Sequence, residues 1–135
     1  MADDPWGIDT SAVDDLIKEM RRIRGRLQPA MRKVAVKGAM NVRDDARARI
    51  IAQSARGYLP RYPNSIGYTI TESSGAAITA EIGPDKNRPQ GALGNILEYG
   101  TSTRPPFPHL QPALDAEADR FERFLGDAAE AAVFE

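Results

Sequence analysis

The residue best suited to acid–base chemistry is His109, the single histidine of the chain. A hydrolytic site needs a nucleophile beside a base, together with a hydrogen-bond donor for the oxyanion. His109 stands between Pro108 and Leu110 in a segment stiffened by proline, and the sequence offers no evident nucleophile to accompany it. We therefore expect His109 to be a surface or interface side chain, and we expect no catalytic residue.

Metal and cofactor sites are equally poorly supported. The chain contains no cysteine, which removes thiolate ligands, thiolate catalysis and disulfides. Asp44 and Asp45 are neighbours on a predicted helix, so their side chains diverge by about 100°. We expect them to be solvated or paired with Arg43 and with Arg47 or Arg49. The tetrapeptide GALG is not followed by Lys-Ser/Thr and is interpreted as loop glycine. The sequence thus predicts no metal, no cofactor and no enzyme.

Charge is the feature that points to a partner, because it is strongly segregated. Residues 1–17 hold five acids and no base, residues 18–56 hold twelve bases and three acids, and residues 57–135 hold six bases and eleven acids. The basic part contains Arg21, Arg22, Arg24 and Arg26, which encircle the predicted helix and have no aromatic residues interleaved. Two interpretations stay open: solvated or inter-subunit contacts, or a grip on nucleic acid.

The length of 135 residues fits one domain. We interpret residues 1–10 as a flexible arm and residues 11–135 as a single domain. Apolar residues at steps of three and four from Val13 to Leu27 predict a helix, and Pro29 is expected to start a second helix or to kink the first. The same face continues to Ser54, with Gly57 as the stop, and Gly38 suggests a close approach of another element.

Prolines 60 and 63 argue against helix between residues 57 and 65. Alternating apolar residues then predict two strands, over residues 66–72 and 77–83, joined by SSGA as an antiparallel hairpin. The next stretch, residues 83–94, is rich in glycine, proline and charge and is expected to be a long exposed loop. Its candidate segment for ordering against a neighbour, or for lining a lumen, consists of Pro84, Asp85, Lys86, Asn87 and Arg88.

The stretch ILEYGTSTRPPFPHLQPAL, residues 96–114, predicts a buried strand, a glycine turn at Gly100, a stiff linker and a last helix starting at Pro112. Phe107 is expected to be a buried anchor. For Glu98 two alternatives stay open, a buried acceptor of hydrogen bonds and an exposed side chain. The fold class is therefore α+β, with N-terminal helices and a C-terminal helix packed on a small, mainly antiparallel sheet that has a long loop before its last strand.

This same stretch resembles the signature of a phage neck family, the tail-completion proteins typified by gene product 10 of phage Hong Kong 97. In that family an E-[YF]-G-T turn precedes a linker with proline and phenylalanine, which leads to P-A-L at the start of the last helix. The residues that carry the resemblance are Glu98, Tyr99, Gly100, Thr101, Pro106, Phe107, Pro108 and Pro112. Together with the basic first helix, the hairpin and the loop, it covers roughly residues 11 to 130.

The resemblance implies a structural virion protein that forms a ring at the head-to-tail junction, completes the tail and joins it to the DNA-filled head. A hexamer is favoured over a dodecamer, with other neck and tail-tube proteins as neighbours and non-specific contact with genomic DNA in the lumen. No membrane is expected as a partner, because no apolar run approaches about 18 residues, and assembly is expected in the bacterial host cytoplasm. The alternative is a non-enzymatic DNA-binding protein that uses the basic N-terminal helices.

Overall fold

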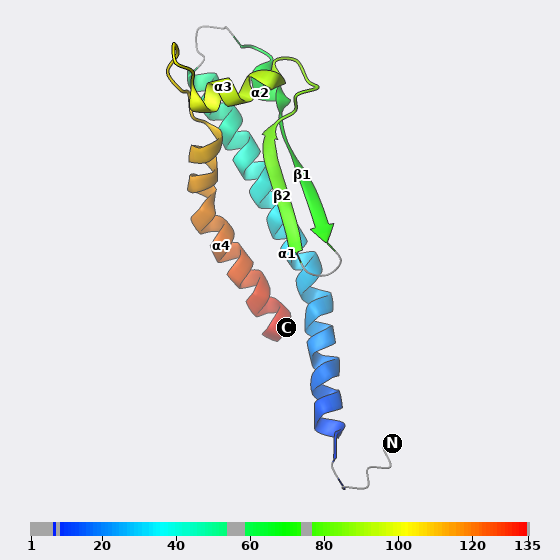
Figure 1. The fold of residues 1–135 in the computed structure, drawn as a ribbon. Coiled ribbons are helices and arrows are strands. Elements are labelled where there is room, and N and C mark those ends of the chain that lie inside the picture. The colour runs from blue at the N-terminus through cyan, green and yellow to red at the C-terminus, as the bar shows by residue number, and fades with distance from the viewer. Residues whose placement is uncertain (1–6, 8, 54–58, 74–76, 135) are drawn as a thin grey trace.

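A single long helix forms the spine of the molecule. The structure, a computed structural model, describes residues 7, 9–53, 59–73 and 77–134. Helix α1 (Ser11–Gln53) runs along the whole molecule, and the β-hairpin and helix α4 pack against it (Figure 1). The predicted flexible arm falls mainly on residues 1–6 and 8, and the predicted helix stop at Gly57 and the SSGA turn also lie largely outside the described residues.

Helix α1 begins where its sequence provides a cap. The Asp9 carboxylate accepts a hydrogen bond from the Ser11 backbone N–H at 2.9 Å, which satisfies one of the free donors of the first turn. Pro29 starts no second helix, because it lies inside the continuous α1. The carbonyl that loses its hydrogen bond belongs to Gly25, four residues earlier, and Gly25 is exposed, so water can bond to this carbonyl. That part of the sequence prediction is wrong.

The two strands form an antiparallel hairpin. Strand β1 (Ile66–Ser73) pairs antiparallel with β2 (Ala77–Pro84), with Ile70 opposite Ala80. Along β2 the half-buried Ile78, Ala80 and Ile82 alternate with exposed residues, so one face of the strand is turned toward the helices. The expected antiparallel hairpin is confirmed.

Two segments are helical where the sequence suggested otherwise. Tyr62–Ser65 forms the short helix α2, because Pro63 stands in its first turn, where no intrahelical N–H is required. The residues predicted as a last strand belong to helix α3 (Gly94–Tyr99), which follows a 3-10 turn over Gly91–Leu93. A short apolar run such as Ile96-Leu97 does not distinguish a strand from a helix by periodicity. Among the described residues the sheet therefore has two strands.

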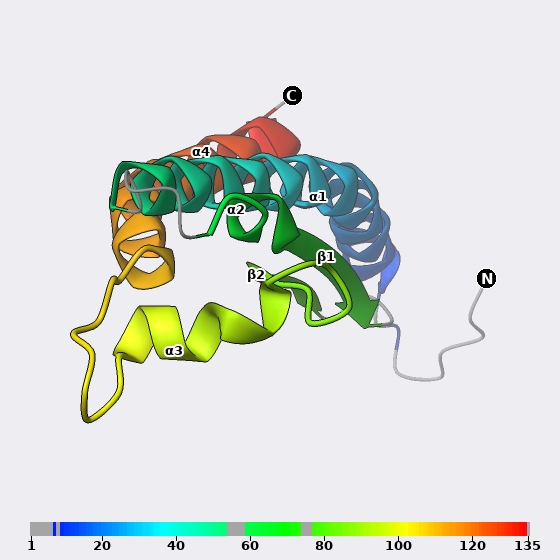
Figure 2. The same ribbon diagram turned by 90° about the horizontal axis from the view of Figure 1, so that it is seen from above.

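Helix α4 (Leu110–Phe134) lies alongside α1 and completes the fold. It begins two residues before Pro112, which occupies its first turn instead of its first position. Seen from above, α1 and α4 run side by side, the hairpin lies along α1, and α3 crosses the end of the molecule (Figure 2). The predicted α+β class is confirmed, with the correction that α3 replaces the third strand.

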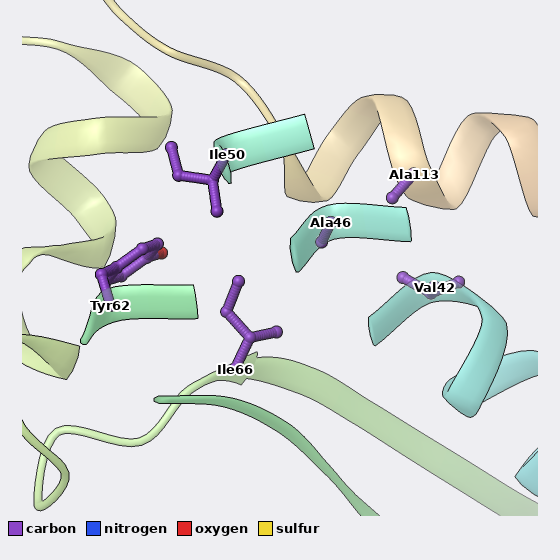
Figure 3. Close-up of a cluster of buried hydrophobic side chains, with 6 residues drawn as sticks. All are labelled: Val42, Ala46, Ile50, Tyr62, Ile66 and Ala113. Carbon is purple, nitrogen blue, oxygen red and sulfur yellow. The ribbon is translucent and has the colours of Figure 1, made fainter. Parts of the chain in front are cut away.

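The core is small and lies at the end of the molecule where α2, α3 and the start of α4 meet α1. Its buried members come from α1, α2, β1 and α4 (Figure 3): Val42, Ala46, Ile50, Tyr62, Ile66 and Ala113. Further along α1, Gly38 is buried, and a Cβ placed on it would lie 2.9 Å from the Phe121 ring. The predicted close approach at Gly38 is therefore confirmed, and its partner is α4.

Candidate functional site

The segment between α3 and α4 is a fixed joint, and its first element is the turn at Gly100. Gly100 has φ 74°, in the left-handed region that favours glycine, and a Cβ there would meet the Pro106 nitrogen at 2.8 Å. Thr101 and Arg104 then close a turn, with the Thr101 N–H donating to the Arg104 carbonyl at 3.0 Å. The predicted sharp turn at Gly100 is confirmed.

Glu98 holds the two helices of the joint together. Its carboxylate is 7% exposed and accepts the backbone N–H groups of His109, Leu110 and Gln111 at 2.9, 3.0 and 3.0 Å. These are free donors at the start of α4, so a side chain from α3 caps a helix that begins twelve residues later. Of the two alternatives for Glu98, the buried acceptor is the correct one.

His109 is fully buried, so the expected surface position is wrong. Its Nε2 lies 2.7 Å from the Tyr62 hydroxyl, and its Nδ1 lies 2.8 Å from the Phe107 carbonyl and 3.0 Å from a Glu98 oxygen. Nδ1 faces two acceptors and therefore carries the proton, while Nε2 accepts from Tyr62. The ring links α2, the linker and the α3 carboxylate. No sequence pattern predicted a role for Tyr62, which lies in a segment predicted to be irregular.

The electrostatics of the joint follow from this geometry. Burial raises the pKa of Glu98, but hydrogen bonds from the N–H groups of Gln111, His109 and Leu110 lower it by a larger amount. The pKa of Glu98 therefore lies below its ordinary value. Burial and then the negative charge of Glu98 raise the pKa of Tyr62 to about 12. Glu98 is thus ionised and Tyr62 neutral over the whole physiological range. Among the described residues, every buried side-chain nitrogen and oxygen has a hydrogen-bond partner.

The linker that crosses the joint is exposed, and this corrects the expectation for Phe107. Its ring is 41% exposed, and its contribution is the backbone N–H, which donates to the Leu97 carbonyl at 2.6 Å. The Pro108 carbonyl accepts from the Gln53 side chain at 3.2 Å, which ties the linker to the end of α1. Pro106 is also exposed, and Tyr99 is 79% exposed. The motif residues therefore divide into a buried fastening and an exposed surface.

The loop from Pro84 to Arg88 is held by the chain itself. The Asp85 N–H donates to the Ser65 carbonyl at 2.8 Å, and the Arg88 N–H donates back to the Asp85 carbonyl at 3.0 Å. The Arg88 guanidinium reaches the Asn64 carbonyl at 3.1 Å, and the Asp85 carboxylate accepts the Asn87 N–H at 2.9 Å. Lys86 is exposed. The loop is fastened to α2, so it carries hydrogen bonds that order it before any neighbour arrives.

The opposite end of the molecule is built differently. We call Ser11–Leu27 of α1 the stalk, because it extends past the hairpin and α4 (Figure 1). Val13, Leu16 and Met20 are 55%, 59% and 60% exposed. They open a run of apolar residues at alternating steps of three and four: Val13, Leu16, Met20, Ile23, Leu27, Ala30 and Val34. That spacing is the seam of a helix that packs lengthwise on another element.

The four candidate arginines, Arg21, Arg22, Arg24 and Arg26, are all exposed on this stalk. Of these four arginines, only Arg22 forms an ion pair within the described residues, with Glu19 of the same helix. The aspartates on α1 behave largely as expected. Arg43 pairs with Asp44 at 2.9 Å and Arg49 with Asp45 at 3.0 Å.

We hypothesise from the charge segregation that these arginines meet acidic residues of a neighbouring subunit, with Asp115, Glu117 and Asp119 of α4 as the candidates. The structure corrects this set at one position. Glu117 is 5% exposed, accepts a hydrogen bond from Asn41 of α1 at 3.0 Å and contacts Arg120. It therefore fastens α4 to α1 and is not free to face a partner. Asp115 and Asp119 are exposed and stay available.

An apolar groove lies between the hairpin and α4. Its volume is about 350 Å³, and its lining includes Val42 of α1, Ala80 and Ile82 of β2, and Leu110 and Leu114 of α4. Glu98 and Tyr99 of α3 line it as well. A larger hollow of about 650 Å³ lies around the end of the hairpin and the following loop, with Tyr68, Asp85 and Arg88 in its lining. Asp85 and Arg88 are only 3.8 Å apart, so their opposite charges offset each other.

The groove and the exposed seam of the stalk are surfaces suited to packing. In the described parts of the chain, no three histidine, aspartate or glutamate side chains are grouped so as to hold a metal ion. None of the described helices combines the length and apolar character needed to cross a bilayer. Comparisons with family models, with curated proteins and with solved structures give no match.

Proposed function

We propose that this chain is a structural virion protein of a tailed bacteriophage, which forms a ring at the head-to-tail junction, completes the tail and joins it to the DNA-filled head. The observation that carries the proposal is the exposed seam of the stalk. Val13, Leu16 and Met20 lie on a helix that is covalently continuous with the packed core. A helix with such a stripe acquires its full stability by packing against another element.

The joint supports the same proposal, together with the resemblance of residues 96–114 to phage neck proteins. A subunit of a ring has to present its contact surfaces at fixed relative positions. Glu98 and His109 fix the start of α4 against α3 and α2, and Gln53 fixes the linker against α1. The motif Glu98-Tyr99-Gly100-Thr101 therefore has a physical role, since it sets the direction of α4 relative to the rest of the subunit.

The ring is proposed to be hexameric, with a dodecamer as the alternative, and to contact neighbouring neck and tail-tube proteins. The exposed arginines of the stalk favour one second candidate, a non-enzymatic DNA-binding protein. In a ring, the same arginines would meet the genome only through the phosphate backbone, so their affinity for DNA would be weak, steeply salt-dependent and indifferent to sequence. Sequence-preferring binding by the purified protein would favour the second candidate.

The test of the proposed function is electron microscopy of lysates from the parent phage with a stop codon in this gene. DNA-filled heads beside separate tails, or tails of abnormal length, are expected. Supply of the intact protein from a plasmid restores joined particles, which controls for effects on other genes. Normal infectious virions from the stop-codon phage would refute the proposal.

A further inference from the structure

We propose that the seam of the stalk binds in the groove between β2 and α4 of a second copy of this chain. This inference rests on the proposed function, because it names the contact through which subunits of the ring would recognise each other. Both surfaces belong to one chain and lie in different parts of it. Each lacks an apolar partner among the described residues, and each supplies what the other needs.

The first argument is the shape and lining of the groove. Val42 of α1 lines it, β2 contributes Ala80 and Ile82, α4 contributes Leu114, and Asn95 and Tyr99 of α3 complete the lining. Leu114 is 49% exposed, so the groove has apolar surface to bury. An elongated apolar groove between a strand and a helix accepts an amphipathic helix, whose anchors repeat every three to four residues.

The lengths are compatible. The stalk comprises residues 11–27, and at 1.5 Å per residue it is about 25 Å long. The groove itself is shorter: the β2 residues that line it run from Ala80 to Pro84, about 13 Å at 3.3 Å per residue. The exposed part of the seam, from Val13 to Met20, is about 10 Å long, so these side chains can lie along the groove while the rest of the stalk extends beyond it.

The second argument is charge. On α4, the exposed Asp115, Asp119 and Glu122 follow the spacing i, i+4, i+7 and form one acidic stripe. Asp115 immediately follows the groove-lining Leu114, and the stripe lies on the side of α4 away from Ala113 and Glu117, which are buried toward α1.

The stalk carries the matching sign. Residues 11–27 hold five bases and three acids, whereas residues 110–134 hold six acids and two bases. Arg21 and Arg24 stand next to the seam, because they lie one and four residues after Met20. With the seam in the groove, these two arginines are placed to face the acidic stripe of α4. Opposite charges arranged in this way set register and speed association.

The same charges argue against a parallel pairing of two stalks. A parallel pair would bring the basic residues 18–26 of the two copies together, and repulsion between like charges opposes it. The freely exposed part of the seam is also short, since Ile23 and Leu27 are already half-buried in the subunit. Two stalks alone would form little more than one heptad of fully free contact. The groove instead provides apolar surface from β2, α4 and the α1 floor.

A contact between different surfaces has a geometric consequence. The stalk of one copy occupies the groove of the next, whose own stalk remains free for a third copy. Such heterologous contacts form a closed ring when the rotation between copies closes, and an open filament when it does not. The joint fixes the angle between the groove and the spine, so it also contributes to which of these forms.

The test uses the absence of native cysteine, which makes every engineered thiol unique. Leu16→Cys places a thiol on the seam and Leu114→Cys places one in the groove. The two variants carry different affinity tags, are mixed and are treated with a short bismaleimide linker. The matched control is Thr79→Cys, an exposed position on β2 next to the groove-lining Ala80, with its side chain on the opposite face of the strand.

The expected product is a covalent dimer that carries both tags, formed from Leu16→Cys with Leu114→Cys at a yield about tenfold above that with Thr79→Cys. A dimer of Leu16→Cys with itself as the main product would show symmetric pairing of stalks and overturn the inference. Equal yields at Leu114 and Thr79, or no dimer at all, would overturn it as well. None of these three results alters the phage phenotype, which tests the proposed function separately.

A charge exchange tests the register independently. Arg21→Glu with Arg24→Glu in the seam variant is expected to lower the yield of mixed dimer by about tenfold. Asp115→Arg with Asp119→Arg in the groove variant is expected to restore it. Circular dichroism of each variant verifies its helical fold before cross-linking. Loss without restoration would contradict the proposed facing of the two stripes.

Discussion

The two ends of this molecule differ in whether their own chain completes them. At the joint, Glu98 meets three N–H donors, and His109 is bonded on both ring nitrogens. At the stalk, Leu16 and Met20 are 59% and 60% exposed. The joint therefore stabilises the subunit, and the stalk presents apolar side chains that another surface can bury. Substitutions at the two ends should consequently affect different properties.

The largest effect on folding is expected from Glu98→Ala. The substitution leaves three N–H groups at the start of α4, one buried and two partly buried, without their acceptor. It should lower the free energy of unfolding by about 3 kcal/mol. Urea unfolding followed by circular dichroism measures it. Glu130→Ala, a change on the exposed face of α4, is the matched control and should stay within about 0.5 kcal/mol. Equal losses at the two positions would remove the special role of the joint.

The contribution of Glu98 should also depend on pH. Its pKa in the folded protein is below the ordinary value, so its stabilisation is present above the unfolded pKa of about 4.3 and is lost as pH falls through the folded pKa. Urea midpoints of the native protein and of Glu98→Gln should therefore differ at neutral pH and converge in acid. A constant difference across this range would mean that the carboxylate charge contributes nothing.

A smaller effect is expected from Tyr62→Phe. The change removes the hydroxyl that lies 2.7 Å from His109 Nε2 and leaves a buried acceptor without its donor. The expected loss is about 1 to 2 kcal/mol in the same urea experiment. Tyr99→Phe serves as the control, because Tyr99 is 79% exposed and should be neutral. A neutral result for Tyr62→Phe would show that the hydrogen bond between Tyr62 and His109 contributes nothing to the free energy of unfolding.

The smallest effect on folding is expected at the stalk. Leu16→Asn combined with Met20→Asn should change the free energy of unfolding of the isolated subunit by no more than about 0.5 kcal/mol, because neither side chain is packed. Association should be lost in sedimentation velocity run over a concentration series. A large loss of subunit stability, with association retained, would show that the seam packs within its own chain.

Salt gives a further comparison of the two ends. Exposed charges on the stalk are screened by salt, while buried hydrogen bonds of the joint are affected much less. Raising the salt concentration should therefore weaken association and leave the urea midpoint of the dilute subunit nearly unchanged. Association that is indifferent to salt would contradict the role proposed for Arg21 and Arg24.

Local patterns in the sequence identified much of this fold. The steps of three and four along α1, the alternation in the hairpin and the need for glycine at position 100 all reflect interactions over a few residues, and the structure contains each of them. What failed depends on distant partners. The burial of His109 requires Tyr62, which is 47 residues earlier. The α3 segment looked like a strand because three apolar or aromatic positions are too few to show a period.

The candidate site shows the same division. The motif around Glu98 was recognised, but its action as a cap for α4 depends on the path of the linker, which folds back over eleven residues. Phe107 was predicted to be a buried anchor because it is a large aromatic residue, but only its backbone N–H is held, by the Leu97 carbonyl. The seam was visible as the apolar face of a helix. Its exposure was not, because an apolar stripe has the same spacing whether its partner is in the same chain or another one.

Hydrogen exchange of backbone amides tests the contrast between the ends most directly, in dilute subunit and in assembled protein. In the dilute subunit, amides of the stalk should exchange fast and those of the first turn of α4 slowly. On assembly, exchange in the stalk should slow by at least about tenfold, while the first turn of α4 stays as it was. A stalk that is already protected in the dilute subunit, or one that gains no protection on assembly, would contradict the account.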